Sequence, residues 1–421
     1  MAEPLTHRPG LSPWRMVIGL GLVSLTIDMV ADGARSISGP MLAQLGASAI
    51  TVGAITGATE AAGLTLRLIS GPWADRTRRY WDFTITGYAL TAVSVPLLAL
   101  APALGFAGLA VAATLLIIER VGKAIRSPAK SVLLADAAGA VGRGRGFGVH
   151  KTLDQIGAFL GPLAVAGVIG VTGVMWPAFV VLVIPAAIAM LLLVQLRRRV
   201  PDPSVYMPAI APTDPDPVER HRTAGTAADS GIPVTFILFA LSSALATFGL
   251  VGFGVISFHL ADSGMVALPV IPLIFALGML AAAVSALGNG WAYDHIGASV
   301  LLVVPGLVTC IPALTLSTSV PAAVVGVVVW GATVGIQDST VKALVADLAP
   351  SGRRGTAYGM FAVLQGVTTF IGATLAGALY NDRALLTAII AVAQVCSLAL
   401  LVVVIRRRHR LERPAPSSSA Q

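Results

Sequence analysis

The sequence predicts an all-α membrane protein of twelve transmembrane helices, arranged as two six-helix bundles related by pseudo-two-fold symmetry. Of its 421 residues, 56% are hydrophobic and only 11% are charged, which is too little charge for the surface of a soluble globular protein. Long apolar runs recur along the whole chain, and one short charged pattern appears twice, about half the chain apart. Repetition at half length indicates two homologous membrane halves.

The apolar runs fix the predicted spans, because a helix needs about 20 apolar residues to cross the hydrocarbon core. The first six spans are predicted at 16–42, 48–73, 83–102, 106–126, 147–171 and 175–196. The second six are predicted at 233–260, 266–290, 299–318, 321–343, 356–380 and 384–405. The first run also resembles the apolar part of a signal peptide. We assign it as a span, because its removal would break the duplication.

The spans divide the chain into four parts. Residues 1–196 form the predicted N-terminal bundle and residues 232–405 the C-terminal bundle. The segment 197–231 between them begins with three arginines and holds six prolines among polar residues, so we expect a flexible cytoplasmic linker. Residues 406–421, basic and then rich in Ser and Pro, are predicted to form a disordered cytoplasmic tail.

The distribution of cations predicts the orientation. The chain has 28 Lys and Arg and a net charge of +8, and nearly all the loop cations lie on the side of the N-terminus, the linker and the tail. The positive-inside rule then places both termini in the cytoplasm and the protein in the cytoplasmic (inner) membrane. The same distribution argues against a nucleic-acid partner. Cys310 and Cys396 both lie inside apolar runs, which favours packing over a disulfide or a metal site.

The repeated charged pattern lies in the loop after span 2 and again after span 8. The first copy reads Gly-Pro-Trp-Ala-Asp-Arg-Thr-Arg-Arg over residues 71–79, and the second keeps the Gly and the Asp over 290–297. It resembles the loop signature of the major facilitator superfamily, although Arg78 stands where that family has Gly and Tyr80 where it has Lys or Arg. The resemblance implies the fold of that family and a gating role for Gly71, Asp75, Arg76, Arg79, Gly290 and Asp294.

Span 5 carries small residues at a spacing that allows close helix packing. Gly157 and Gly161 form a small-x-x-x-small face, and Pro162 is expected to bend the helix. The segment resembles part of a motif in drug–proton antiporters, with Val165 and Ala166 in place of its last two glycines. That resemblance favours export over import.

Charged residues inside the predicted spans are the candidate site residues. A charge near the bilayer centre costs about 2.5–3.5 kcal/mol on insertion scales, so it must face a partner or water. Most of these charges lie in the first half. The residues assigned to proton coupling or to a solute cavity are Asp28, Glu60, Glu119, Arg120, Lys123, Asp154 and Asp338.

Span 4 carries a charged stripe at i, i+4, i+7 and i+11, formed by Glu119, Lys123, Arg126 and Lys130. Residues at these spacings share one helix face, which is untenable against lipid. We expect this face to line a cavity or to contact other helices. Lys130 is the exception, because it is expected to extend toward the membrane surface.

Asp154 and Asp28 are the leading candidates for proton coupling. Asp154 has only Lys151 near it in the sequence, so burial rather than a cation would set its proton affinity. Glu60 and Glu119 rank behind them, since each has basic residues within two helical turns.

Together these features predict a secondary active transporter that moves a small organic solute by alternating access, as proton-coupled efflux. An uptake permease or facilitator for an organic anion or zwitterion is the alternative. A membrane enzyme or a transport-dead sensor belongs to another class; an enzyme would need a constellation of His, Cys or Ser, and the membrane His259 stands alone. No Walker loop occurs, so ATP is not the expected energy source. We expect no cofactor and no metal; the expected partners are the solute, protons and membrane lipid, with the protein acting as a monomer.

Overall fold

A computed structural model describes the chain except for residues 1–10, 207–231, 342–343, 346–347, 349–353 and 413–421. The described residues form helices and no strands. The first half consists of six antiparallel segments. In chain order they are α1 (Pro13–Ser36) with α2 (Ser38–Gln44), α3 (Ala49–Thr65) with α4 (Arg67–Thr77), α5 (Tyr80–Leu97) with η1 (Leu98–Ala107), α6 (Gly108–Gly139), α7 (Arg143–Thr172), and α8 (Trp176–Val181) with α9 (Val183–Arg199).

The second half repeats this arrangement after a short helix η2 (Pro203–Tyr206). Its six segments are α11 (Val234–Phe248) with α12 (Phe253–Asp262), α13 (Val270–Ile296), η3 (Gly297–Val303) with α14 (Val304–Thr315), α15 (Val320–Ile336) with η4 (Gln337–Val341), α17 (Arg354–Ala378), and α18 (Arg383–Glu412).

In the described ranges, eleven helical stretches are long and apolar enough to cross a membrane. One of them, Tyr80–Gly139, has 60 residues, and at 1.5 Å per residue a single helix of that length would be about three times the thickness of the hydrocarbon core. It is a hairpin, because the chain reverses at Gly105, where φ is 54°. Within the described residues the crossing segments therefore number twelve, in two sets of six, and the predicted fold class is confirmed.

Several helices extend beyond the predicted spans. Helix α6 continues to Gly139 rather than ending at 126, and α18 reaches Glu412 rather than 405. The end of an apolar run predicts where the helix leaves the lipid, not where the helix itself ends. A helix can continue into water because its backbone hydrogen bonds are made within the helix. Arg197 to Arg199, expected to start the linker, are the last turn of α9. Residues 207–231 and 413–421 of the predicted linker and tail lie outside the described residues.

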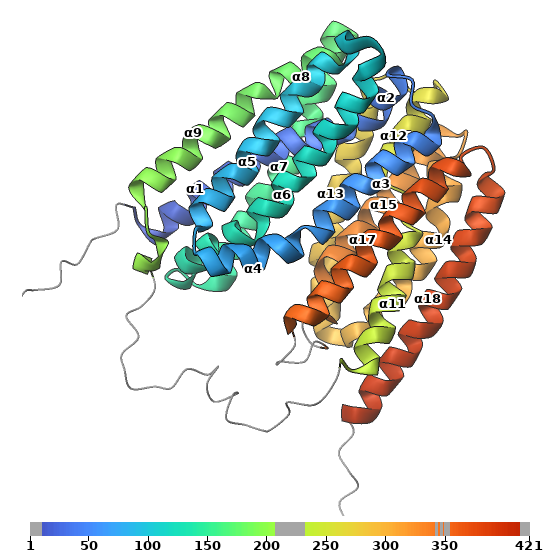
Figure 1. Ribbon diagram of the computed structural model, residues 1–421. Coiled ribbons are helices and arrows are strands. Elements are labelled where there is room, and N and C mark those ends of the chain that lie inside the picture. The colour runs from blue at the N-terminus through green and yellow to red at the C-terminus, as the bar shows by residue number, and fades with distance from the viewer. Residues whose placement is uncertain (1–10, 207–231, 342–343, 346–347, 349–353, 413–421) are drawn as a thin grey trace, which may run out of the picture.

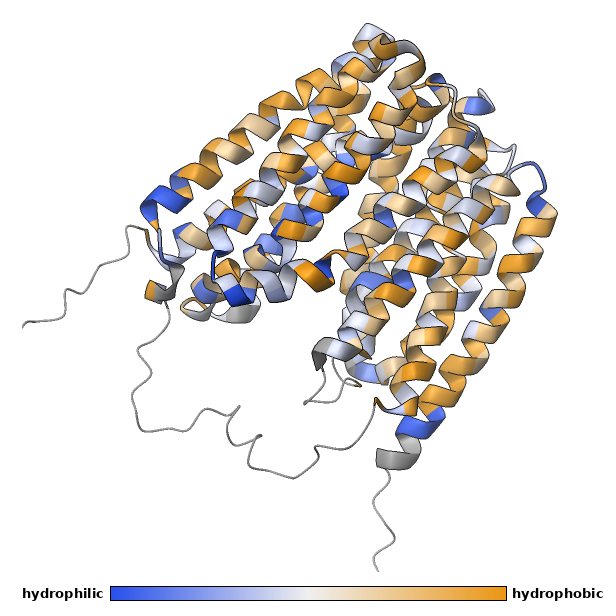
Figure 2. Cartoon of the chain, in the orientation of Figure 1, coloured by the Kyte–Doolittle hydropathy of each residue, from blue (hydrophilic) through white to orange (hydrophobic). Residues whose placement is uncertain are grey.

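The two halves stand side by side, and the described chain begins and ends on one side of the molecule (Figure 1). We call this side, where α9 ends and α11 begins, the linker side, and the opposite side the far side. Apolar residues cover most of the length of outer helices such as α9 and α18, whereas polar residues gather at helix ends and inside the first half (Figure 2). This pattern suits a protein that is surrounded by lipid.

Glycines bring the two halves into close contact. A Cβ atom added to Gly53 on α3 would meet the carbonyl oxygen of Ala373 on α17, and one on Gly377 would meet the carbonyl oxygen of Ala49. On the far side, a Cβ atom on Gly39 of α2 would meet the carbonyl oxygen of Gly254 on α12. Small residues let helix backbones approach in a membrane. The contact between the halves therefore depends on these glycines.

The loop after α4 forms its tight turn without glycine. Arg78 ends the helix with φ 53° and ψ 18°, in the left-handed region that glycine usually occupies. This is the one described residue other than glycine with a positive φ. A left-handed residue with a side chain costs roughly 1–2 kcal/mol. The turn typical of the family signature is therefore present, but it is strained.

The glycine contact can be tested by stability. Gly53→Ala places a methyl group against backbone atoms of α17, which cannot move aside as a side chain can, so we expect a loss of about 1–3 kcal/mol in the free energy of unfolding. The matched control is Gly167→Ala on α7, where a Cβ would meet nothing within 4 Å. That variant should gain up to about 1 kcal/mol from helix propensity. Equal effects in SDS titrations of the purified protein would contradict the prediction.

Candidate functional site

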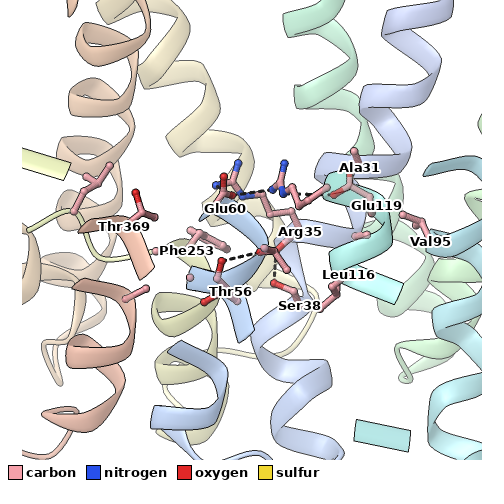
Figure 3. Close-up of a pocket in the computed structure, with 18 residues that line it drawn as sticks. Ala31, Arg35, Ser38, Thr56, Glu60, Val95, Leu116, Glu119, Phe253 and Thr369 are labelled. Carbon is pink, nitrogen blue, oxygen red and sulfur yellow. Dashed lines mark hydrogen bonds and ion pairs between the residues drawn. The ribbon is translucent and has the colours of Figure 1, made fainter. Parts of the chain in front are cut away.

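A pocket lies between the two halves, nearer the far side than the linker side. Its walls come from α1, α3 and α6 of the first half, and from residues 250–254 and α17 of the second half. Phe253 and Thr369 enter from the second half, opposite Arg35, Glu60 and Glu119 of the first (Figure 3). The pocket is thus formed only where both halves meet.

The cavity volume is about 60 Å³, which is room for a few water molecules. Ligand pockets for small molecules are typically about 300–1,000 Å³. An organic solute fits only if the halves move apart.

Four charged side chains form a network along the wall of the first half. Arg35 Nη2 lies 2.8 Å from Glu60 Oε1, and Arg120 Nη2 lies 3.0 Å from the same oxygen. Arg120 Nε also lies 3.4 Å from Glu119 Oε2. The network joins α1, α3 and α6. The basic residue within two helical turns of Glu60 in the sequence is Arg67, whereas the ion pairs of Glu60 come from Arg35 and Arg120.

A second network lies deeper in the first half and toward its linker side. Arg126 Nη2 on α6 lies 3.6 Å from Asp28 Oδ1 on α1, and Arg126 Nη1 donates a 2.7 Å hydrogen bond to Thr91 Oγ1 on α5. The guanidinium carbon also sits 4.7 Å from the centre of the Tyr88 ring. Both members of the ion pair are buried, with 4% and 10% of the Arg126 and Asp28 side chains exposed. The charged stripe of α6 therefore faces other helices, as expected.

Asp154 on α7 joins this second network. Its Oδ2 lies 2.9 Å from Lys151 Nζ, and its Oδ1 lies 3.9 Å from Lys130 Nζ on α6. The carboxyl groups of Asp154 and Asp28 also lie within hydrogen-bonding reach of each other. Lys151 is the one Lys or Arg close to Asp154 in the sequence, but α6 packs beside α7 and adds Lys130. The expectation that burial rather than a cation dominates the surroundings of Asp154 is therefore wrong.

Lys130 points into the bundle rather than toward the membrane surface, which corrects its expected position. Its Nζ donates to Ser24 Oγ at 3.1 Å, and Ser24 Oγ also contacts Tyr88 Oη at 3.0 Å and His150 Nε2 at 3.1 Å. Sequence reasoning missed Ser24, Tyr88 and His150. They were missed because the sequence prediction considered charged residues in the spans. A signal did exist for two of them, since Ser24 lies four residues before Asp28 and His150 four residues before Asp154, each on the same helix face.

Lys123 and Asp338 connect these networks electrostatically. Lys123 lies close enough to both Asp28 and Glu60 to interact with each carboxylate. Asp338, on η4 of the second half, lies close enough to Arg67 and Lys151 of the first half to attract both. It is thus the one predicted charged site residue that reaches across from the second half.

The loop residues of the repeated pattern lie on the linker side. Tyr80 Oη donates to Asp75 Oδ1 at 3.3 Å, while Arg79 Nε pairs with Asp82 Oδ2 at 2.7 Å. Asp82 Oδ1 also lies 2.9 Å from Arg197 Nη2 on α9. Of the remaining residues, Gly71 approaches Pro128 of α6, Arg76 is exposed, Gly290 is half-buried in α13, and the Asp294 side chain lies outside what the structure describes.

The small residues of α7 bring it against α1. A Cβ atom on Gly157 would meet the carbonyl oxygen of Leu25, and one on Gly161 would meet the carbonyl oxygen of Met29. Pro162 lies inside α7 one residue further on. This close approach places Asp154 beside Asp28.

A polar cluster missed by the sequence reasoning lies on the far side of the second half. Tyr380 Oη contacts His259 Nδ1 at 2.9 Å and Asp262 Oδ2 at 3.1 Å, while His259 Nε2 contacts the Ser317 carbonyl oxygen at 3.0 Å. Burial, together with the hydrogen bond to Asp262, raises the pKa of the Tyr380 phenol above its ordinary value. The membrane histidine therefore has partners, although none is close to it in the sequence.

A pocket between two six-helix halves, walled by buried ion pairs, defines a membrane transport protein. The model of the Major Facilitator Superfamily matches residues 20–254 and 235–421. The chain belongs to this family and is a transporter rather than an enzyme. An uncharacterized protein of Mycobacterium tuberculosis is 45% identical over 415 residues, which is 97% of this chain and 96% of that protein.

Solved structures have the same fold at low sequence identity. The peptide transporter POT superposes with a TM-score of 0.70 at 19% identity, covering 94% of this chain and 95% of that one. The xylose transporter XylE from E. coli, in an inward-open conformation, superposes with a TM-score of 0.66 at 13% identity, covering 97% and 98%. At these identities the likeness shows the fold alone.

The buried and exposed ion pairs should differ in their effect on stability. Arg126→Met leaves Asp28 buried without its arginine, so we expect a loss of about 3–5 kcal/mol in the free energy of unfolding. The control is Arg79→Met, which breaks a pair whose arginine side chain is 70% exposed and should cost about 0–1 kcal/mol. SDS titration of both purified variants measures the difference. Similar losses in the two variants would show that the buried Asp28–Arg126 pair contributes no more to the free energy of unfolding than the exposed pair does.

Proposed function

We propose that the protein exports a small organic solute, driven by the proton gradient, through alternating access of its two halves. The observation that carries the coupling is the meeting of Asp28 and Asp154, from α1 and α7, within a buried network of cations. Such a pair can bind and release a proton inside the membrane. Asp28 and Asp154 were also the leading candidates from the sequence.

The chemistry of this pair follows from its geometry. Two carboxyl groups within hydrogen-bonding reach require a proton on one of them, because two carboxylates at that separation repel each other. Arg126 forms an ion pair with Asp28, and Lys130 and Lys151 form ion pairs with Asp154. A helix movement that brings a lysine closer to Asp154 favours release of the shared proton. The pair therefore titrates as a unit rather than as two independent groups.

Alternating access is supported by the small cavity and by the glycine contacts between the halves. A solute reaches the pocket only after α2 and α3 separate from α12 and α17, or after the linker-side ends part. The proposal includes a gating role for the loop residues of the repeated pattern, which are Gly71, Asp75, Arg76, Arg79, Gly290 and Asp294. It also places the protein in the inner membrane, with its linker side in the cytoplasm, and takes it to act as a monomer. The cation distribution supports that orientation.

Export rests on the sequence around Gly157, Gly161 and Pro162, which resembles the antiporter motif. Uptake of an organic anion or zwitterion remains the second candidate, because the pocket wall holds both arginines and glutamates. The experiment that decides is metabolite profiling of inverted membrane vesicles that contain or lack the protein, with and without an imposed proton gradient. Accumulation of a solute only with the gradient supports export. Gradient-driven depletion of a preloaded solute would instead support uptake.

Once the solute is known, Asp154→Asn tests the coupling. We expect this variant to lose gradient-driven accumulation while it still exchanges labelled solute across the membrane, because exchange needs alternating access but no net proton release. The control is Asp82→Asn on the linker side, which should keep accumulation. Normal accumulation with unchanged pH dependence in Asp154→Asn would place the coupling site elsewhere, and Asp28→Asn would then be measured.

A further inference from the structure

The pocket contains one carboxylate oxygen whose bonding is incomplete. Glu119 is 5% exposed, and its Oε1 has no hydrogen-bond partner in the described part of the chain. Its Oε2 receives only Arg120 Nε, at 3.4 Å. Hydrogen bonds between charged groups are usually about 2.7–2.9 Å long, so this contact is weak. Glu119 is therefore a buried carboxylate with one long ion pair, to Arg120, and one oxygen that has no donor in the described part of the chain.

Glu60, in the same pocket, shows the opposite arrangement. One of its oxygens accepts from both Arg35 at 2.8 Å and Arg120 at 3.0 Å. The short contact of Arg120 is thus made with Glu60, and only its Nε remains for Glu119. Glu60 therefore has two short contacts with arginines and Glu119 has one long contact, although both carboxylates line the same cavity.

The unpaired Oε1 of Glu119 needs a hydrogen-bond donor, because buried polar atoms are normally hydrogen-bonded. A donor brought in from the cavity meets this need. Both apolar and hydroxyl side chains line the cavity, among them Leu116 and Thr56, and in the described part of the chain none of them donates to Oε1. The donor therefore comes from outside the chain, as water while the cavity holds only water and as a group of the solute once a solute is bound.

We infer that Glu119 binds a protonated amino group of the transported solute; this inference rests on the proposed transport function. An ammonium group supplies N–H donors and the opposite charge in one small group. The Arg35 side chain lines the same cavity and is 30% exposed, so it can meet an acidic group on the same molecule. The solute class is therefore a small amine carrying an acidic group, that is, a zwitterion.

The first test needs no solute. Glu119→Gln removes an undercompensated buried charge, so the Tm of the purified protein should stay the same or rise. Glu60→Gln is the matched control, and it should lower the Tm by several degrees because it removes the carboxylate of Arg35 and leaves Arg120 only its longer contact with Glu119. A structural role for Glu119 predicts a fall in both variants. A fall in Glu119→Gln equal to that in Glu60→Gln would overturn the inference.

The second test uses a panel of small amino acids and primary amines, each paired with its N-acetylated form, which lacks the ammonium charge. At least one amine should raise the Tm of the wild-type protein, its acetylated form should not, and Glu119→Gln should lose the shift. The inference fails if no amine shifts the Tm, if acetylated forms act equally, or if Glu119→Gln keeps the shift. Asp154-dependent accumulation of a solute without an amino group would remove this inference and leave the proposed function standing.

Discussion

The structure depends on one constraint, which is that a charge placed inside the membrane must be partnered within the protein. The first half meets this constraint with ion pairs between helices: Arg35 and Arg120 join α1 and α6 to Glu60 of α3, and Arg126 joins α6 to Asp28 of α1. Helix α6 takes part in both networks. Its charged stripe therefore fixes how α1, α3 and α7 pack, and the same contacts place titratable groups beside the solute pocket.

The two halves are alike in fold but not in chemistry. At the position in the second half that corresponds to Asp154 stands Gln365, whose Nε2 donates to Ser243 Oγ at 2.7 Å, and Ser242 pairs with Ser397 nearby. These are neutral hydrogen bonds, which hold a bundle together without a titrating group. In the proposed function, the first half thus carries the proton chemistry. The second half mainly supplies a wall, which meets the first half through Gly254, Ala373 and Gly377.

The sequence predicted the fold because its evidence is local: apolar runs set the spans, and the repeated charged pattern set the two halves. It also identified the charged residues that line the pocket and form the second network, since any charge in a span stands out; their roles in transport stay predictions. It did not predict their partners. Lys130 beside Asp154, or Arg35 beside Glu60, depends on which helices are neighbours and how they are rotated. Ser24, Tyr88 and Tyr380 were missed because the prediction relied on charged residues within the spans, and an uncharged polar side chain does not reveal which neighbouring helix supplies its partner.

The central claim is that Asp28 and Asp154 share one proton inside the membrane. Infrared spectroscopy of the protein in lipid nanodiscs tests it directly, because a protonated carboxyl group and a carboxylate differ in their C=O stretching bands. At neutral pH the wild-type protein should show a protonated-carboxyl band that is lost in Asp28→Asn and in Asp154→Asn but retained in Glu119→Gln. A wild-type spectrum without that band, or a band that survives both aspartate substitutions, would contradict the account.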